Sequence, residues 1–256
     1  MNANAVVEIG AIDIIKQDAA GACQTSGTCE HVRLTDDGGT FDLLTLQDGA
    51  TATLANYVLD AGRYRQLRFF VETATVTLAG DHTFPDGSNT KALIIPSGAQ
   101  TGIKVNLGWG NDGDGPAGID VLPGETIIVI DFDVMQNFRV QGDPDSPQGI
   151  QDVLFTPMLR AVVQDVAGSI AGTVTDTAGA AVEGATVLAT MTDAGTIEAL
   201  QTPTASALTD ATGAYTVMFL APGTYEVLVD GMAADTLTVT VGEDQDVTGV
   251  NFSGTF

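Results

Sequence analysis

Short runs of β-branched and aromatic residues, in which apolar and polar side chains alternate, recur along the whole chain. Clusters of Gly, Asp, Asn and Pro separate them. Alternation with a period of two puts the apolar side chains on one face of a strand, and the clusters supply tight turns. No segment holds an apolar stripe at helical spacing for three turns. The sequence therefore predicts an all-β protein.

The basic residues divide the chain into two parts. All nine Lys and Arg lie between Lys16 and Arg160, whereas residues 161–256 contain twelve acidic residues and no basic one. This change indicates a boundary near Asp165–Gly168. We expect two β-sandwich domains in tandem, residues 1–166 and 167–256. Seven strands in about ninety residues of the second part are typical of an immunoglobulin-like sandwich.

Each domain has its own set of expected strands. In the first domain we expect them near Val6–Ile15, Phe41–Leu46, Ala50–Ala55, Arg63–Leu78, Ala92–Ile95, Ile103–Leu107, Glu125–Asp133 and Val153–Val163. In the second domain we expect them near Ser169–Thr175, Ala185–Met191, Ser206–Thr209, Ala214–Phe219, Thr224–Val229, Thr236–Val241 and Val247–Phe252.

The formal net charge is −24, from 33 acidic and 9 basic residues. Nucleic-acid binding needs clustered Lys and Arg, so this composition argues against a nucleic-acid partner. No apolar run approaches the roughly 18 residues that a membrane span requires, so we expect no transmembrane segment. The segment Met1–Glu8 lacks the basic and apolar parts of a secretory signal, so the signal of an exported chain is absent from this numbering.

The only cysteines, Cys23 and Cys29, lie in a loop of small residues, Gly21–Glu30. A disulfide is the favoured use, and it would stabilise the fold by about 2 kcal/mol. Because disulfides persist in oxidising compartments, we expect an extracellular or cell-surface location. A metal pair is the alternative, but the chain offers no second cysteine pair and only two histidines, His31 and His82.

The second part resembles the carboxypeptidase regulatory-like family, which has a transthyretin-like fold. The matching segments are Gly168–Asp176, Gly184–Val187, Thr209–Tyr215 and Leu220–Tyr225. Asp210 before Gly213, and Pro222 before Gly223, supply tight turns. The resemblance implies a non-catalytic module of the kind attached to surface proteins, and some relatives of this fold bind glycans.

The first part resembles a family of prokaryotic secreted and lipoprotein domains of unknown function that often precede such modules. The segments that carry the resemblance are Phe41–Leu46, Leu59–Arg68, Ile95–Lys104 and Ile130–Asp133. The resemblance implies no activity.

Motifs of common enzyme classes are absent from the sequence: there is no Gly-x-Ser-x-Gly elbow, no His-Glu-x-x-His and no phosphate loop. Ser97, between Pro96 and Gly98, has the setting of a nucleophile in a turn, but a β-turn before the strand at Ile103 explains the same residues. We therefore expect no catalytic site.

Asp131 and Asp133 form the most suggestive carboxylate pair, because residues two apart in a strand project from the same face. Three roles are open: a cation site, a receptor for the arginine cluster Arg63, Arg65 and Arg68, or an acid–base pair for glycoside cleavage. An internal ion-pair network with the arginine cluster is the favoured interpretation.

A glycine-rich loop offers further hard oxygen ligands, from Asn111, Asp112, Asp114 and Asp120. Calcium accepts such irregular loops, although the spacing is not that of an EF-hand, and a solvated turn is the alternative. Trp109 lies beside this loop as a candidate for stacking on a sugar ring, or as a partly buried core residue. No cofactor is certain, and calcium is the candidate.

The sequence thus favours a non-catalytic extracellular or cell-surface structural or adhesive protein, whose partners are copies of itself or other cell-surface proteins. Its stronger form is a filament subunit assembled by strand exchange, since sheet edges are templates for added strands. The N-terminal segment is a candidate for donation through its apolar side chains Val6, Val7, Ile9, Ile12 and Ile14. The alternatives are a carbohydrate-binding surface module and an accessory domain of a glycan-active enzyme.

Overall fold

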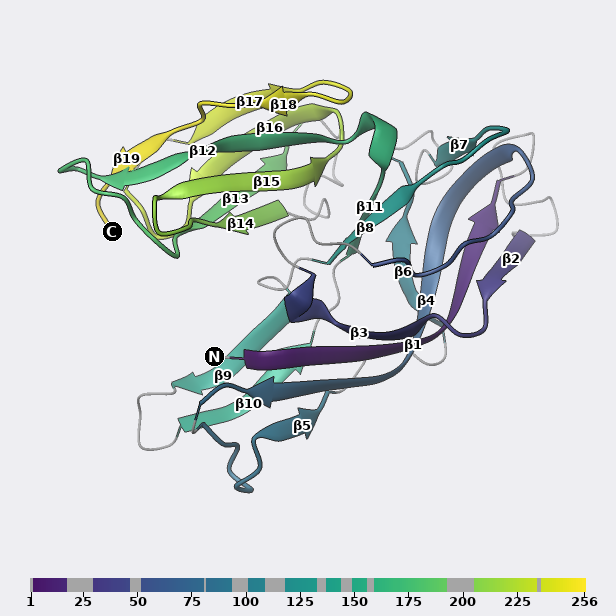
Figure 1. The fold of residues 1–256 in the computed structure, drawn as a ribbon, viewed down its shortest axis with the longest axis horizontal. Helices are drawn as coiled ribbons and strands as arrows, with labels where there is room; N and C mark the ends of the chain where they lie inside the picture. Colours follow the sequence, from purple (N-terminus) through teal and green to yellow (C-terminus); the bar gives the residue numbers. More distant parts are fainter. Residues whose placement is uncertain are drawn as a thin grey trace. The chain divides into compact units, whose positions relative to one another are not determined.

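A computed structural model describes residues 2–17, 30–46, 52–80, 82–93, 101–108, 118–132, 137–143, 149–155, 159–192, 205–233 and 236–256. These residues are mainly β-strands, which confirms the expected fold class (Figure 1). The chain forms two compact units: Met1–Leu107, Gly118–Pro123 and Phe132–Leu159 make the first, and Gly108–Ala117, Gly124–Asp131 and Arg160–Phe256 make the second. None of the described residues belongs to a helix long and apolar enough to span a membrane.

A seven-stranded antiparallel sheet is the main element of the first unit, and its two central strands are unusually long. Strand β1 (Asn2–Lys16) pairs along nearly its whole length with β4 (Gly62–Leu78). Five short strands line the outer edges of this pair. Against β1 lie β2 (Glu30–Thr35) and β3 (Gly39–Asp42), and against β4 lie β5 (Thr90–Ala92), β6 (Ile103–Asn106) and β7 (Ile119–Val121).

Each of the two long strands contains a β-bulge, and the two bulges lie beside each other. The β1–β4 register shifts at Gly10 in β1 and again at Glu72 in β4, so each strand contains one extra residue there. A Cβ on Gly10 would overlap the Glu72 side chain. Because both strands shift together, the apolar side chains stay on one face: Leu67, Phe69 and Val71 before the bulge, and Ala74, Val76 and Leu78 after it, are all buried.

A tight turn at this same level lets β2 and β3 share one edge of β1. The Gly38 N–H donates to the carbonyls of Ile9 and Gly10, both at 3.0 Å, and Gly39 has a φ of 91°. Residues Asp36–Gly39 therefore form the connection between β2 and β3.

Two further strand pairs precede the second sandwich. Strand β9 (Phe138–Asp143) forms a hairpin with β10 (Gly149–Phe155), and β8 (Ile128–Phe132) pairs with β11 (Leu159–Val163). Val129 of β8 and Val162 of β11 are buried in the hydrophobic core of the second unit. This core therefore includes residues from before position 167, and the domain boundary at residues 166 and 167 stays a prediction.

The second unit contains two four-stranded sheets around one core, as expected for a transthyretin-like or immunoglobulin-like sandwich. One sheet has the order β14 (Ala205–Leu208), β13 (Thr186–Met191), β16 (Gly223–Val229) and β17 (Leu237–Val241). The other has β15 (Ala214–Leu220) beside β12 (Gly168–Asp176), which also pairs with β18 (Asp246–Val247) and β19 (Phe252–Gly254). Six expected strands are confirmed. Of the seventh, expected at Val247–Phe252, only the first and last residues belong to strands, β18 and β19.

Sequence patterns predict the first unit less completely. Strands β2, β7 and β9 were not expected, because each is short and contains only two apolar residues in alternation. The expected strand at Phe41–Leu46 ends early in a 3₁₀ turn, Leu43–Thr45, where the Asp42 carboxylate accepts from the Leu44 N–H. The expected strand at Val153–Val163 comprises the end of β10 and all of β11.

The two units share one local device at the start of an inner strand. Tyr64 lies two residues after Gly62, the first residue of β4, and its hydroxyl donates to the Asp60 carbonyl at 2.9 Å. Tyr225 lies two residues after the first residue of β16, and its hydroxyl donates to the Ala221 carbonyl at 2.8 Å. Both rings are buried. Each hydrogen bond closes the entrance to its strand in the manner of a tyrosine corner.

We expect Tyr64→Phe and Tyr225→Phe each to lower the free energy of unfolding of its own unit by about 1–2 kcal/mol, because a carbonyl loses its partner. Urea unfolding followed by circular dichroism measures the change. Tyr57, which is 51% exposed, supplies the matched control in Tyr57→Phe. Equal losses in all three variants would contradict a role for these hydrogen bonds.

In the second sandwich, β12 lies very close to the segment before β19. A Cβ on Gly172 would overlap the carbonyl oxygen of Val250. That same oxygen accepts a hydrogen bond of 2.6 Å from the Tyr215 hydroxyl, and burial raises the pKa of Tyr215 far above its usual value. Gly172 is thus the residue that lets Val250 approach both β12 and Tyr215.

Gly172→Ala should therefore destabilise the second unit by about 1–3 kcal/mol, since the added methyl group meets backbone that cannot rotate away. The control is Gly242→Ala, whose methyl group would meet only the end of the Gln245 side chain. Thermal unfolding of the two variants gives the comparison. A Gly172→Ala protein as stable as Gly242→Ala would show that the close approach is not required.

Candidate functional site

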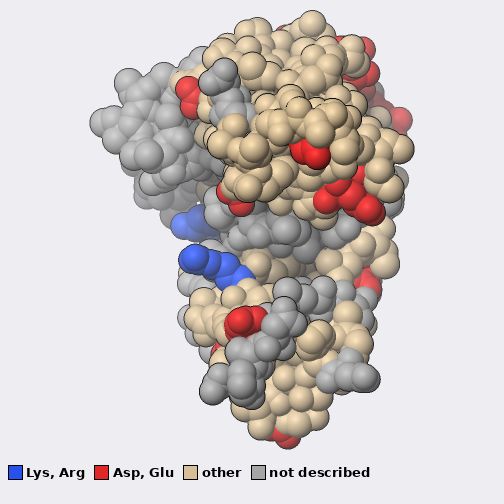
Figure 2. Space-filling view, turned by 90° about the vertical axis from the view of Figure 1, so that its left-hand side faces the viewer, with Lys and Arg blue, Asp and Glu red and all other residues tan. Residues whose placement is uncertain are grey.

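Basic side chains are scarce on this chain. On the face shown in Figure 2, acidic side chains (red) are spread over the surface, whereas basic side chains (blue) occupy one small area. The charged surface on this face is therefore mainly acidic, and its basic charge is confined to that area.

Among the described residues, the polar cluster with the most ion pairs is built around Asp13 of β1. The β1–β2 register shifts after Ile12 and places Asp13 directly opposite Arg33 of β2. On its other side, Asp13 lies directly opposite Arg68 of β4. Lys104 of β6 is in turn opposite Arg68. Directly opposed residues share a face, so these four side chains form one row across four strands.

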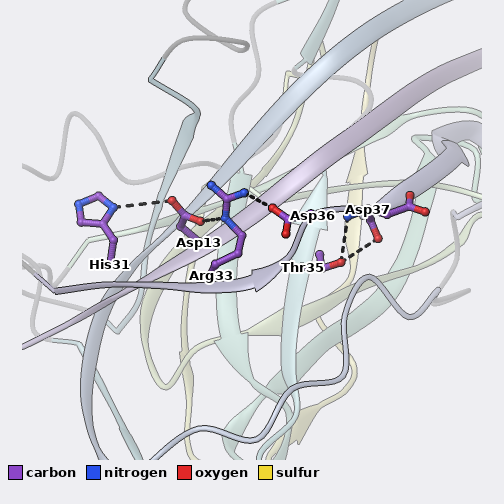
Figure 3. Close-up of polar contacts among 6 residues, drawn as sticks. All are labelled: Asp13, His31, Arg33, Thr35, Asp36 and Asp37. Carbon is purple, nitrogen blue, oxygen red and sulfur yellow. Dashed lines mark hydrogen bonds and ion pairs between the residues drawn. The ribbon is translucent and has the colours of Figure 1, made fainter.

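Asp13 is buried, with 6% of its surface exposed, and its charge is balanced by β2. Arg33 donates through Nε to Asp13 and through a terminal nitrogen to Asp36 (Figure 3). His31 Nδ1 lies 3.7 Å from the second Asp13 oxygen. Hydrogen bonds to Asp13, and then to Asp36, raise the pKa of Arg33. The Arg33 guanidinium also lies 5.6 Å from the centre of the Phe70 ring.

These contacts make the cluster a structural ion pair that holds the outer strand β2 and the turn after it. Thr35 supports the turn, because its hydroxyl accepts from the Asp37 N–H at 3.1 Å (Figure 3). A buried carboxylate needs such partners, since an unpaired charge in this position would be strongly unfavourable.

Arg68 and Lys104, the other two side chains of the row, have different contacts. Arg68 donates through Nε to the Gln66 side chain at 3.2 Å, and Gln66 donates to Asn106 at 3.0 Å. Within the described ranges, no carboxylate lies within 4 Å of Arg68 or of Lys104. We refer to Arg68 and Lys104 as the cationic pair.

The arginine cluster predicted from the sequence is divided among three surroundings. Arg63 lies 3.6 Å from Asp120 and so links β4 to β7. Arg65 is buried at the point where the β1–β4 register shifts, and Arg68 belongs to the cationic pair. Asp131 accepts from a different arginine, Arg160 of β11. The ion pair that Asp131 forms is therefore with an arginine outside the predicted cluster.

Several predicted site residues lie outside the described residues: Cys23, Cys29, Ser97, Trp109, Asn111, Asp112, Asp114 and Asp133. The disulfide, the glycan contact and the calcium loop thus stay predictions. In the described ranges no group of three or more His, Cys, Asp and Glu side chains is placed to hold a metal ion. Of the predicted calcium ligands, Asp120 and Asp131 each contact an arginine.

The predicted assembly strand is an inner strand of its own sheet. β1 pairs with β4 on one side and with β2 and β3 on the other, and Val7, Ile12 and Ile14 are buried. Donating this strand to a neighbour would require the first unit to open its own sheet.

Sequence reasoning missed Asp13 and Lys104. The available signal was the position of Asp13 in the apolar run Ala11–Ile15, since a carboxylate inside a buried strand needs a nearby cation. Nothing in the sequence around Lys104 indicates that it lies opposite Arg68.

Comparison with protein families agrees with both sequence resemblances. Residues 2–157 match the model described as "Domain of unknown function (DUF4382)", and residues 169–253 match the carboxypeptidase regulatory-like domain. The first match covers more than half of the chain, so the chain belongs to the DUF4382 family and carries a carboxypeptidase regulatory-like domain after it. No curated protein matches the chain.

Several solved structures have distant similarity to the chain. The Bacillus anthracis TIE protein is 11% identical with a TM-score of 0.28; the match covers 99% of this chain and 52% of that one, so the chain spans about half its length. The minor pilin GBS52 of Streptococcus agalactiae is 13% identical with a TM-score of 0.25, covering 97% and 84%. The major pilin BcpA of Bacillus cereus is 10% identical with a TM-score of 0.29, covering 97% and 95%.

The Asp13 cluster generates a stability prediction. Asp13→Asn should lower the free energy of unfolding of the first unit by about 1–2 kcal/mol, because Arg33 loses a charged acceptor beside a buried site. Asp36→Asn is the matched control, since the Asp36 side chain is 84% exposed and its ion pair should contribute less than about 0.5 kcal/mol. Urea unfolding measures both, and equal effects would contradict the assignment.

Proposed function

We propose that the chain is a non-catalytic structural or adhesive protein that acts outside the cell or at its surface. The observation that carries the proposal is a set of outer strands. Within the described part of the chain, β2, β14, β15 and β17 each pair with one strand only. An outer strand presents backbone N–H and C=O groups to other chains, which makes it a template for association.

The use of titratable groups supports a structural role. Asp131 contacts Arg160, Asp120 contacts Arg63, and Lys91 Nζ lies 2.9 Å from Asp152. The hydrogen bond from Lys91, and then that from the Val153 N–H, lowers the pKa of Asp152. These carboxylates join strands of one unit to each other, which is the role of ion pairs in a rigid module.

Hydroxyl groups on the strands add to this picture. The hydroxyls of Thr77 and Thr90 lie 2.9 Å apart across β4 and β5, and the Thr73 hydroxyl donates to Glu8 at 2.9 Å. In the second unit the hydroxyls of Thr224 and Thr240 lie 3.4 Å apart across β16 and β17. Cross-strand pairs of this kind stabilise a sheet while its outer face stays polar.

Strand exchange through β1 is the less favourable route to assembly, because β1 is buried between its own neighbours. We propose association at outer surfaces instead. The proposed partners are other copies of this chain or other surface proteins.

Two measurements on the full chain test the proposal. A membrane-impermeant label applied to intact producing cells should modify the protein, and light scattering with negative-stain imaging should show particles larger than one chain. A control protein of the cell interior must stay unlabelled. A protein labelled only after lysis, and monomeric at every concentration, would contradict the proposed function.

A further inference from the structure

Most basic side chains of this chain already have a local contact. Arg33, Arg63, Lys91 and Arg160 each lie within 4 Å of a carboxylate. Arg65 is buried, and Lys16 Nζ lies 5.8 Å from the centre of the Tyr64 ring. Among the described residues, the cations without such a contact are Arg68, Lys104 and Arg139.

Two of these three are direct neighbours, since Arg68 of β4 and Lys104 of β6 are opposite each other in the sheet. Directly opposed side chains have Cβ atoms about 5 Å apart, and like charges in this position destabilise a sheet. Lys104 and its neighbour Asn106 are exposed. Asp13, which is opposite Arg68 on the other side, is already paired with Arg33. The free chain therefore holds two like charges side by side on an accessible sheet face, although its net charge is −24. An anionic surface laid over the pair would relieve that repulsion.

The second unit has the opposite imbalance. Residues 161–256 contain twelve acidic residues and no basic one, so no carboxylate there has a cation from its own segment. Asp176 and Asp210 are occupied by their own turns, each accepting from two backbone N–H groups. Glu243 and Asp244, in the turn between β17 and β18, are exposed. We refer to Glu243 and Asp244 as the acidic turn.

We propose that the cationic pair of one copy binds the acidic turn of a second copy. The inference rests on the proposed function, because it names the contact through which the chain associates with itself. The two surfaces belong to different units, so the contact is heterologous, and two bound copies together retain one unused surface of each kind. Association can then continue from copy to copy.

Salt dependence separates this contact from strand addition. Exposed charges interact over about 10 Å at 0.1 M ionic strength and over about 3 Å at 1 M. Association through the cationic pair should therefore be strong at low ionic strength and weaken steeply as salt is added. Association through backbone hydrogen bonds of outer strands would change little.

The test compares single charge reversals by sedimentation velocity. Lys104→Glu and Glu243→Lys should each weaken self-association at least about tenfold, because each places like charges in contact. Mixed in equal amounts, the two variants should associate again, since the reversed surfaces are complementary to each other. Arg139→Glu and Glu183→Lys make the same charge changes at exposed positions outside the two surfaces and should leave association unchanged.

The outcomes are distinguishable. Recovery on mixing, with both controls unchanged, supports the contact. Wild-type assemblies that resist 1 M salt and tolerate both reversals would overturn it while leaving the proposed function intact. A wild-type chain that is monomeric at low salt but is labelled on intact cells would also overturn the proposed contact, without contradicting the proposed function. Unchanged self-association with loss of dextran sulfate binding in Lys104→Glu would overturn it and assign the pair to an anionic glycan.

Discussion

The pairing of β1 with β4 is the interaction on which the first unit depends. Five short strands complete that sheet, and each of them pairs with one of the two long strands. Isolated short strands are marginal in water, so these five form because a long template is already present. The same pairing sets the chemistry of the outer face. It places Asp13 opposite Arg68, and a second shift of register places Asp13 opposite Arg33.

The paired bulges at Gly10 and Glu72 keep the apolar side chains of these long strands on one face. A one-residue shift in only one strand would turn every later side chain to the wrong face. Gly10 and Glu72 compensate each other, and the turn at Gly38 makes its hydrogen bonds to the backbone at this same level. The tyrosine corners are a parallel case in the two units. Tyr64 and Tyr225 follow the same pattern, Leu-x-x-Gly-x-Tyr, and make the same bond to the carbonyl four residues earlier.

The sequence was sufficient where structure is local. The second unit's strands and turns could be predicted because residues such as Asp210 and Gly213 specify a turn by their own conformational preferences. Short charged strands such as β2 form only against a partner, so their own residues contain little signal. The positions of the charged side chains in the site depend instead on the register between strands that are far apart in the sequence. Arg160 reaches Asp131 and Lys104 faces Arg68 because of how strands align, which the alternation pattern does not encode.

The distribution of charge also restricts how copies of this chain can meet. Residues 161–256 contain carboxylates and no basic side chain, so a symmetric contact between two such segments is opposed by repulsion. A symmetric contact between two cationic pairs is opposed for the same reason. The contact that stays electrostatically favourable is between unlike surfaces, the cationic pair of the first unit in one copy and the acidic turn of the second unit in another. Contacts between unlike surfaces form rings or open filaments rather than closed dimers, and which of the two results depends on the rotation between successive copies.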